Sequence, residues 1–218
     1  MAHVEPRRRE ELSELEPILA GVEAAMGFVP NSMLTMAYMP QLTVAFSMLA
    51  GTAFGADLRG MMSQYADIVP AQTDAGDKLT PGMIQLIAYA ASVAAGCRYC
   101  QAHTSHSAVR AGETEEKLTG VLEFETADVY SDAERAVIAL ALAAAAAPNE
   151  ADANHFEGLR AHFTERQIVQ IVQIVGIVSL FGFLNRWNDT MATYLEEHPK
   201  RFAQEHLGEC GWTVSKHD

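Results

Sequence analysis

The chain reads Gly96-Cys97-Arg98-Tyr99-Cys100-Gln101-Ala102-His103-Thr104-Ser105-His106 near its middle. This stretch holds two of the three cysteines, and they follow a glycine that closes an apolar run. A second helical pattern continues from them to about Ala111, so we predict that Cys97 and Cys100 stand at the start of a helix. The free N–H groups and the dipole of a helix start favour a thiolate, which predicts a redox-active pair.

The composition is that of a globular protein. The chain has 218 residues, of which 49% are hydrophobic and 20% are charged, enough apolar material for one domain with a sizeable core. The formal net charge of -13 opposes binding to a nucleic-acid backbone, so we expect no nucleic-acid partner. Helices rich in Ala, Met, Ile and Val leave apolar faces that self-associate, which predicts a homo-oligomer.

The cysteine count and the apolar segments indicate the cellular compartment of the protein. Three cysteines are too few, and an odd number, for a secreted disulfide framework, so we expect a reducing cytoplasm with one C-x-x-C pair. The basic run at residues 7–9 has no apolar segment after it, which argues against a signal peptide. The most apolar window, residues 168–184, is interrupted by Gln170 and Gln173 and is shorter than a membrane span. We expect a buried core helix there and no membrane partner.

Hydrophobic spacing of three and four residues predicts an all-α protein without convincing strands. The expected helices cover residues 10–26, 31–38, 40–50, 80–95, 97–111, 114–122, 131–147 and 164–195. The last of these is expected to close at His198-Pro199. A looser segment from Gly55 to Asp77 is the best candidate for an internal boundary.

The helix that opens at Thr80-Pro81 is apolar almost all round, so it is expected to be buried on most faces. Its few polar side chains then need partners. Gln85 and Ser92 are seven residues apart and share one face of this helix. We predict that Gln85 faces the two cysteines from this preceding helix.

Two kinds of chemistry fit the Cys/His stretch. A zinc site would use Cys97, Cys100, His103 and His106, but on one helix these side chains fan over about half of the circumference and cannot all face one ion. No second ligand pair is evident elsewhere, so we predict no metal and no other cofactor. A redox pair needs only two sulfurs in reach and a proton relay. His103 lies at i+3 from Cys100 and is the nearest candidate acid or base, while His106 lies further round.

These residues together resemble a known family. Similar features are the capped apolar helix, Gly96-Cys97-x-x-Cys100, the nearby histidines, and an Ile/Val-rich helix that runs into Asn185-Arg186. The chain resembles the carboxymuconolactone decarboxylase and alkyl hydroperoxidase D-like family. The segments 27–31 and 39–40 are similar to the amino-terminal part of its peroxidase-related members.

The resemblance implies a fold and an activity. Such proteins are all-α and oligomeric, which suggests a single domain over residues 1–218, with a family-like core at about 75–195 and a helical extension at 1–75. The paired cysteines would reduce a hydroperoxide substrate, and a reducing thiol or dithiol protein partner would recycle the disulfide. Cys100 would be the peroxidatic cysteine and Cys97 the resolving one. The sequence therefore predicts an oxidoreductase, a thiol-dependent peroxidase.

Two positions depart from the pattern of that family. Its peroxidases carry a glutamate where this chain has Gln85 and a histidine where it has Thr104. An amide cannot accept and return a proton as a carboxylate can, so the relay would be weakened. His106 falls where some members carry a further histidine. Two alternatives stay open: a redox-inactive or sensing helical oligomer of the same fold, and a lactone decarboxylase, whose typical members lack the cysteine pair.

Overall fold

The structure is a computed structural model that describes residues 3–67, 69, 77–191 and 195–214. Over these residues its regular structure is helical and contains no strand, which confirms the all-α prediction. The side chains of residues 179–191, Asn185 and Arg186 among them, lie outside what the structure describes. The chain divides into two compact units, residues 1–78 and 79–218, which are described separately. The single domain expected from the sequence stays a prediction.

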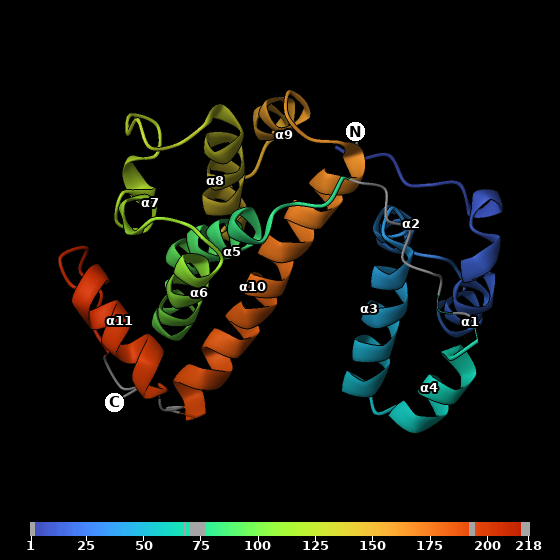
Figure 1. Ribbon diagram of the computed structural model, residues 1–218. Helices are drawn as coiled ribbons and strands as arrows, with labels where there is room; N and C mark the ends of the chain where they lie inside the picture. The colour runs from blue at the N-terminus through green and yellow to red at the C-terminus, as the bar shows by residue number, and fades with distance from the viewer. Residues whose placement is uncertain (1–2, 68, 70–76, 192–194, 215–218) are drawn as a thin grey trace. The chain divides into compact units, whose positions relative to one another are not determined.

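The first unit is a small helical cluster (Figure 1). Its helices are η1 (Arg9–Glu11), η2 (Ser13–Leu15), α1 (Glu16–Met26), α2 (Asn31–Met36), α3 (Pro40–Ala53) and α4 (Leu58–Tyr65). Buried side chains of the first helices form its core, with Leu12, Leu15, Ile18, Leu19 and Met33 at the centre. The α-helix predicted from residue 10 begins only at Glu16 because Pro17 occupies its first turn. A proline further inside a helix would lose a hydrogen bond and clash with the preceding turn.

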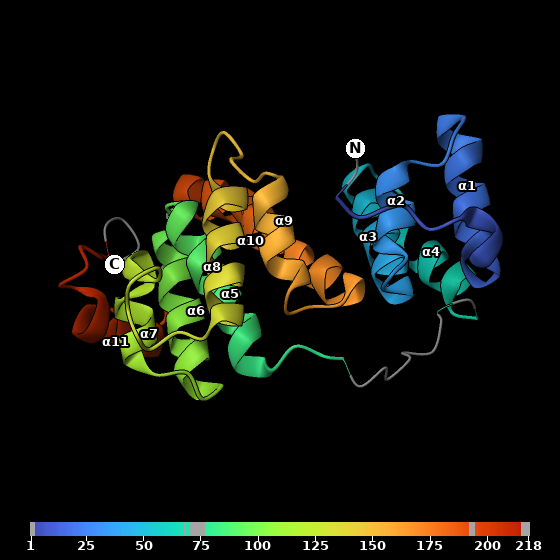
Figure 2. The same cartoon turned by 90° about the horizontal axis from the view of Figure 1, so that it is seen from above.

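The second unit contains the cysteine pair and is built around one helix. Its elements are α5 (Pro81–Ala94), α6 (Arg98–Arg110), α7 (Glu115–Thr119), η3 (Val121–Glu123), α8 (Asp132–Ala145), α9 (Ala153–Arg160), α10 (Glu165–Met191) and α11 (Glu197–Leu207). Helix α5 packs against α6, α8 and α10, and α11 lies against α6 and α7 (Figure 1). Helix α9 packs beside α8, as the view from above shows (Figure 2).

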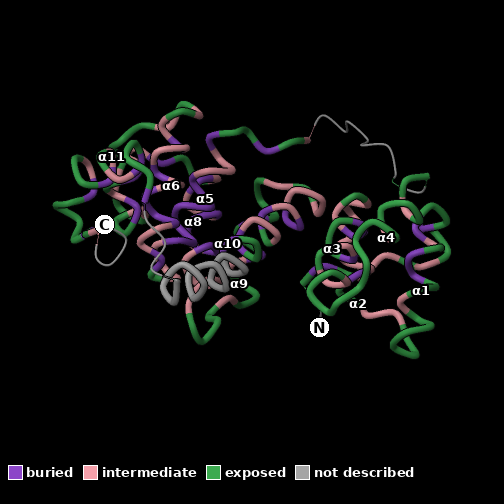
Figure 3. The backbone as a smooth tube through the Cα atoms, turned by 90° about the horizontal axis from the view of Figure 1, so that it is seen from below, coloured by how far each residue is buried: buried purple, intermediate pink, exposed green. Residues whose placement is uncertain are grey.

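The position of α5 follows from its sequence. Thr80 caps it by accepting a hydrogen bond from the N–H of Met83 at 3.2 Å, and Pro81 occupies its first turn. Every residue from Leu86 to Ser92 is buried, and the buried trace gathers on α5 and its neighbours (Figure 3). A helix that is apolar on all sides is stable only inside a core, because each face then removes hydrocarbon from water. The predicted burial of this helix is confirmed.

An ion pair links helix α7 to helix α8. Lys117 of α7 donates to the carboxylates of Glu113 and Glu134, and its side chain is largely buried. Glu134 also accepts from the N–H of Ser131 at 2.8 Å in the capping box that opens α8. The two carboxylates therefore satisfy the ammonium group, and the capping box supplies further hydrogen bonds to Glu134, as burial of charges requires.

Helix α11 was not predicted from the sequence. The segment His198-Pro199 was expected to end a helix, but Pro199 lies in the first turn of α11, where its missing N–H costs nothing. The buried positions Pro199, Ala203 and Leu207 recur every four residues, a helical spacing that could have revealed the element. This correction matters because α11 contacts the helix of the cysteine pair.

Within the part of the chain that the structure describes, no helix is both long and apolar enough to cross a membrane.

Candidate active site

The corner between α5 and α6 places the first cysteine. The N–H of Gly96 donates to the carbonyl of Val93 at 3.0 Å, and the N–H of Cys97 donates to the carbonyl of Ser92 at 3.1 Å. These two bonds form a Schellman motif, which requires a left-handed residue, and Gly96 supplies it with φ of +66°. Cys97 is thus both the residue that closes α5 and the N-cap of α6.

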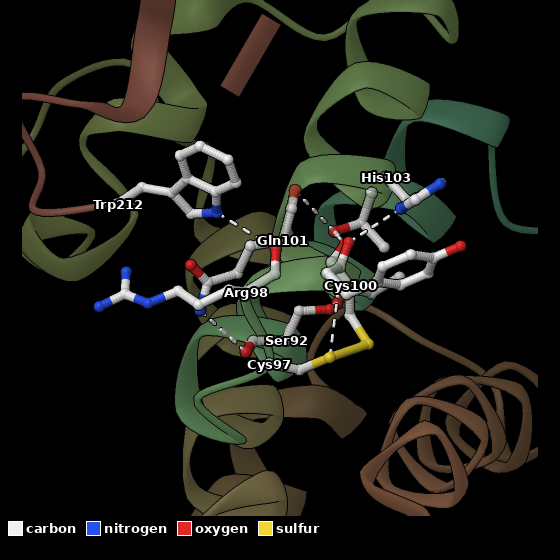
Figure 4. Close-up of a disulfide and its surroundings, with 10 residues drawn as sticks. Ser92, Cys97, Arg98, Cys100, Gln101, His103 and Trp212 are labelled. Carbon is white, nitrogen blue, oxygen red and sulfur yellow. Dashed lines mark hydrogen bonds between the residues drawn. A yellow bond between two sulfur atoms is a disulfide. The ribbon is translucent and has the colours of Figure 1, made fainter. Parts of the chain in front are cut away.

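The two cysteines form a disulfide at the start of α6 (Figure 4). Their Cα atoms are 5.2 Å apart, within the usual range for a disulfide. The sulfur of Cys97 also accepts a hydrogen bond from the N–H of Cys100 at 3.1 Å. The prediction that this pair stands at a helix start is confirmed. Cys210 is a free, exposed thiol, and the prediction that mild oxidation joins Cys97 and Cys100 without touching Cys210 stays a prediction.

The two sulfur-bearing residues differ in access and in stabilisation. Cys97 is fully buried, whereas Cys100 retains 7% of its surface. The N–H of Cys100 and the positive end of the α6 dipole act on the Cys97 sulfur, and both would favour its thiolate after reduction. Cys100 is thus the less deeply buried of the two, and Cys97 is the one whose sulfur receives a stabilising hydrogen bond.

Behind the pair, Ser92 joins the two helices. Its carbonyl accepts from the Cys97 N–H and from the side-chain amide of Gln101 at 3.2 Å, and its hydroxyl donates to the carbonyl of Ala88 at 2.7 Å. Ser92 is completely buried, so each of these bonds is made away from water. The turn that carries the cysteines is thereby held by main-chain and side-chain bonds as well as by the disulfide.

His103 is held by Glu196, the N-cap of α11. Its Nε2 lies 2.7 Å from a Glu196 carboxylate oxygen, and its Nδ1 lies 2.9 Å from the carbonyl of Tyr99. The Tyr99 hydroxyl donates to the other Glu196 oxygen at 3.4 Å, and its ring stacks on that of His103. Figure 4 shows the His103 ring turned away from the sulfur bridge. Both ring nitrogens thus face acceptors on Tyr99 and Glu196.

This cluster also shifts the acidity of its members. Partial burial alone would raise the pKa of Glu196, but a hydrogen bond from its own N–H, the charge of His103 and bonds from His103 and Tyr99 lower it overall. Burial, followed by the nearby Glu196 charge, raises the pKa of the Tyr99 hydroxyl. Glu196 is therefore a carboxylate and Tyr99 a neutral hydrogen-bond donor at neutral pH.

His106 has different surroundings. It lies on α6 with its ring edge against Phe202 of α11, with ring centroids 5.8 Å apart. Burial lowers its pKa, and the positive charges of Arg110, His198 and His103 lower it further. The ring therefore favours the neutral form and serves as part of the packing between α6 and α11.

Gln85 and Thr104, the two residues that depart from the family pattern, are placed by the structure as follows. Gln85 is half-buried on α5, and its orientation toward the sulfurs stays a prediction. Thr104 donates its hydroxyl to the carbonyl of Cys100 at 2.7 Å, an ordinary helix contact that gives it no free proton to relay. The catalytic roles of His103, His106 and Gln85 likewise stay predictions.

Two residues of the site could not be expected from the C-x-x-C motif. Glu196 binds His103 and Tyr99, and the indole N–H of Trp212 donates to the carbonyl of Arg98 at 3.1 Å. Both lie roughly a hundred positions further along the chain, so no local spacing reveals them. Among the residues that the structure describes, no group of three or more His, Cys, Asp or Glu side chains is placed to hold a metal ion.

The fold and the site define a class: all-helical proteins with a redox-capable cysteine pair at a helix start, packed on a buried apolar helix. The model of the carboxymuconolactone decarboxylase family matches residues 62–144. Crystal structures of the debrominase Bmp8 are similar over nearly the whole chain. The apo structure is 34% identical, and a cysteine-to-alanine variant in complex with 2,3,4-tribromopyrrole is 33% identical. Each comparison covers 94% of this chain and 97% of that chain, with a TM-score of 0.54.

The chain therefore belongs to the carboxymuconolactone decarboxylase family, as the resemblance implied. It has no match among curated proteins. The peroxidase function that the resemblance also implied is wrong. The solved structures to which the chain is a third identical are those of a debrominase. The error arose because a C-x-x-C pair supplies two electrons to any acceptor that reaches it, and the motif alone does not identify the acceptor.

Proposed function

We propose that this protein is a thiol-dependent dehalogenase that removes bromine from a small brominated aromatic ring by reduction. The observation that carries the proposal is the Cys97–Cys100 disulfide at the start of α6, in a chain a third identical to a debrominase over nearly its full length. A brominated pyrrole is bound in one of those related structures, in a variant that lacks a cysteine.

The reaction balances with the two cysteines as the electron source. The Cys100 thiolate attacks bromine, so that an S–Br bond forms and the C–Br bond breaks with its electron pair left on the ring carbon. A proton from solvent or a nearby acid then makes the C–H bond. The Cys97 thiolate attacks the Cys100 sulfur, the disulfide forms and bromide leaves. In sum, the dithiol and the aryl bromide give the disulfide, the arene, bromide and a proton.

The assignment of the two sulfurs rests on their surroundings. Cys100 retains more exposed surface than Cys97, and Cys97 has the hydrogen bond from the Cys100 N–H that stabilises a thiolate. The disulfide product must be reduced before the next turnover, so the cycle needs a thiol or dithiol reductant as co-reactant. We place the reducing thiol partner expected from the sequence in that role.

A single-turnover experiment tests this proposal. The full-length protein is reduced, freed of reductant without air and mixed with 2,3,4-tribromopyrrole, and bromide is measured by ion chromatography. We expect about one bromide per cysteine pair, with appearance of the disulfide and of the ring that has lost one bromine. Cys210→Ser is the matched control and should react like the wild type, because Cys210 lies outside the pair.

The variants of the pair complete the test. Cys100→Ser should release no bromide, whereas Cys97→Ser should stop at the S–Br stage and turn over only if an external thiol displaces the bromide. The reverse pattern would exchange the two roles. Equal, negligible release from the wild type and both variants would overturn the proposal and favour a redox-inactive or sensing disulfide.

A further inference from the structure

A cavity lies next to the turn of the cysteine pair but does not include either sulfur. Its volume is about 260 Å³, and its walls come from α5, the start of α6, the α7–η3 segment and the residues that follow α11. Gly96 and Arg98, the neighbours of Cys97, line it. In Figure 4 the side chains of Arg98, Gln101 and Trp212 lie on the side of the turn away from the disulfide. The cavity is thus distinct from the place where the sulfurs react.

Two polar groups at this cavity make no hydrogen bond to a residue that the structure describes. Tyr89 is 3% exposed, and its hydroxyl makes no hydrogen bond to any residue that the structure describes. Gln101 is 7% exposed; its amide nitrogen is used by the Ser92 carbonyl, but its side-chain oxygen has no partner there. Neither atom is closed off from solvent, so both can bond to a molecule in the cavity.

The remaining lining defines what that partner must look like. Leu118, Val121 and Leu207 give apolar walls, and Trp212 adds an aromatic one. Arg98 is the cationic residue among those that line this cavity, in a chain whose net charge is strongly negative. Apolar walls with a few convergent polar groups are typical of small-molecule sites.

The protonation state of Tyr89 adds to this description. Burial raises its pKa, with further increases from the neighbouring Cys210 and Tyr130. The hydroxyl is therefore neutral and able to donate a hydrogen bond at neutral pH.

We propose that this cavity is a second ligand site, which binds a small aromatic carboxylate that carries a hydroxyl group. The ring lies between the leucine and valine side chains and Trp212, and the carboxylate pairs with Arg98. The hydroxyl donates to the Gln101 side-chain oxygen and accepts from Tyr89. The site is independent of dehalogenation, because neither reacting sulfur lines it.

The test uses three probes of nearly equal shape with the full-length oxidised protein: 4-hydroxybenzoate, its neutral analogue 4-hydroxybenzamide, and benzoate. Binding is measured by calorimetry. We expect 4-hydroxybenzoate to bind roughly tenfold or more tightly than the amide, since it alone of these two pairs its charge with Arg98. Benzoate should bind several-fold more weakly than 4-hydroxybenzoate, because it leaves Tyr89 and Gln101 unpaired.

Two variants assign these differences to residues. Arg98→Gln should abolish the preference for the anion over the amide. Tyr89→Phe keeps the ring and should weaken 4-hydroxybenzoate roughly three- to tenfold while leaving benzoate unchanged, so a folding defect would be recognised by its effect on both ligands. Tyr38→Phe, in the first unit, is the matched control and should change neither.

Cys210 provides an independent readout, because this exposed thiol lines the cavity. With the other two cysteines in the disulfide, iodoacetamide reacts with Cys210 alone, and 4-hydroxybenzoate should slow that reaction several-fold. Binding that does not distinguish the three probes, or protection of Cys210 that survives both variants, would overturn the proposal. Absence of binding at millimolar concentration would do the same.

Discussion

The two ends of α6 differ in how they are held. At the sulfur end, Cys97 and Cys100 are fixed by local bonds, a Schellman corner and an N-cap, all within a few residues. At the histidine end, His103 and His106 contact α11, about a hundred residues further on. The sequence suggested that His103, and further round His106, could relay protons for the cysteine pair, and these roles stay predictions. The structure shows that a short motif predicts local geometry well, while the partner of each side chain depends on distant segments.

The largest expected effect is the difference in activity between a variant at the sulfur end of α6 and one at the histidine end. We expect Cys100→Ser to abolish bromide release, a loss of at least about 10³-fold, because the attacking sulfur is gone. His103→Gln should lower the rate less than tenfold, below the usual ~10²–10⁴-fold worth of a general acid or base, since its ring nitrogens are bonded to Tyr99 and Glu196. Steady-state rates with excess dithiol measure both. A hundredfold loss in His103→Gln would place this ring in the relay after all.

This contrast explains what could be predicted from the sequence. The cap at Thr80, the buried α5 and the cysteine turn follow from patterns within about fifteen residues, and the structure confirms them. Helix α11 was missed because Pro199 was taken as a stop, although a proline in the first turn is also a start. Without α11, neither Glu196 nor Trp212 could be placed near the motif, and the histidines appeared free to serve the sulfurs.

The second effect concerns stability at the sulfur end. Trp212 is 4% exposed, and its indole N–H donates to Arg98, which lies between the cysteines. Trp212→Ala should lower the free energy of unfolding by about 3–5 kcal/mol, the usual cost of removing a large buried ring. Trp212→Phe should cost about 1 kcal/mol, because it mainly removes the hydrogen bond. Urea titrations of both variants, compared with the wild type, give the two numbers; equal losses would mean that the packing of the ring adds nothing beyond the hydrogen bond.

A smaller loss of stability is expected when Gly96, at the corner between α5 and α6, is replaced. Gly96 has a φ of +66°, and a Cβ placed there would meet no atom within 4 Å. Gly96→Ala should therefore destabilise by about 1–2 kcal/mol through backbone strain alone. Gly21→Ala, in the interior of α1 with equally open space, is the control and should stabilise slightly. Thermal unfolding checks both, and an unchanged midpoint for Gly96→Ala would show that the corner can adopt another conformation.

The smallest effect is in the pH dependence of the histidine end. The folded pKa of His106 is lowered, so stability falls as pH drops below its ordinary value near ~6.5 and levels off below the folded value. The folded pKa of Glu196 is also lowered, so its contribution is present above ~4.3 and is lost as pH falls through the folded value. Each change should be well under about 1 kcal/mol, because both groups are partly exposed.

Two variants separate these contributions in urea titrations across pH. His106→Gln should remove the slope between about pH 7 and 5, and Glu196→Gln should remove the slope below about pH 4.5. The oxidised cysteine pair has no proton to gain, so the sulfur end does not contribute to the pH dependence of the free energy of unfolding over this range. A slope near neutral pH that persists in His106→Gln would assign it to another histidine.

The two residues between the cysteines are each bound from outside the motif: the carbonyl of Arg98 by Trp212, and the hydroxyl of Tyr99 by Glu196. Together with the bond from Cys97 to Ser92, these contacts do not depend on the sulfur–sulfur bond. Reduction therefore leaves the turn in place, and the two thiols keep a high effective concentration toward each other. In the proposed reaction, a sulfur that has taken a halogen atom would meet its partner before water or a foreign thiol arrives. The proposed turnover would then require almost no reorganisation of the backbone.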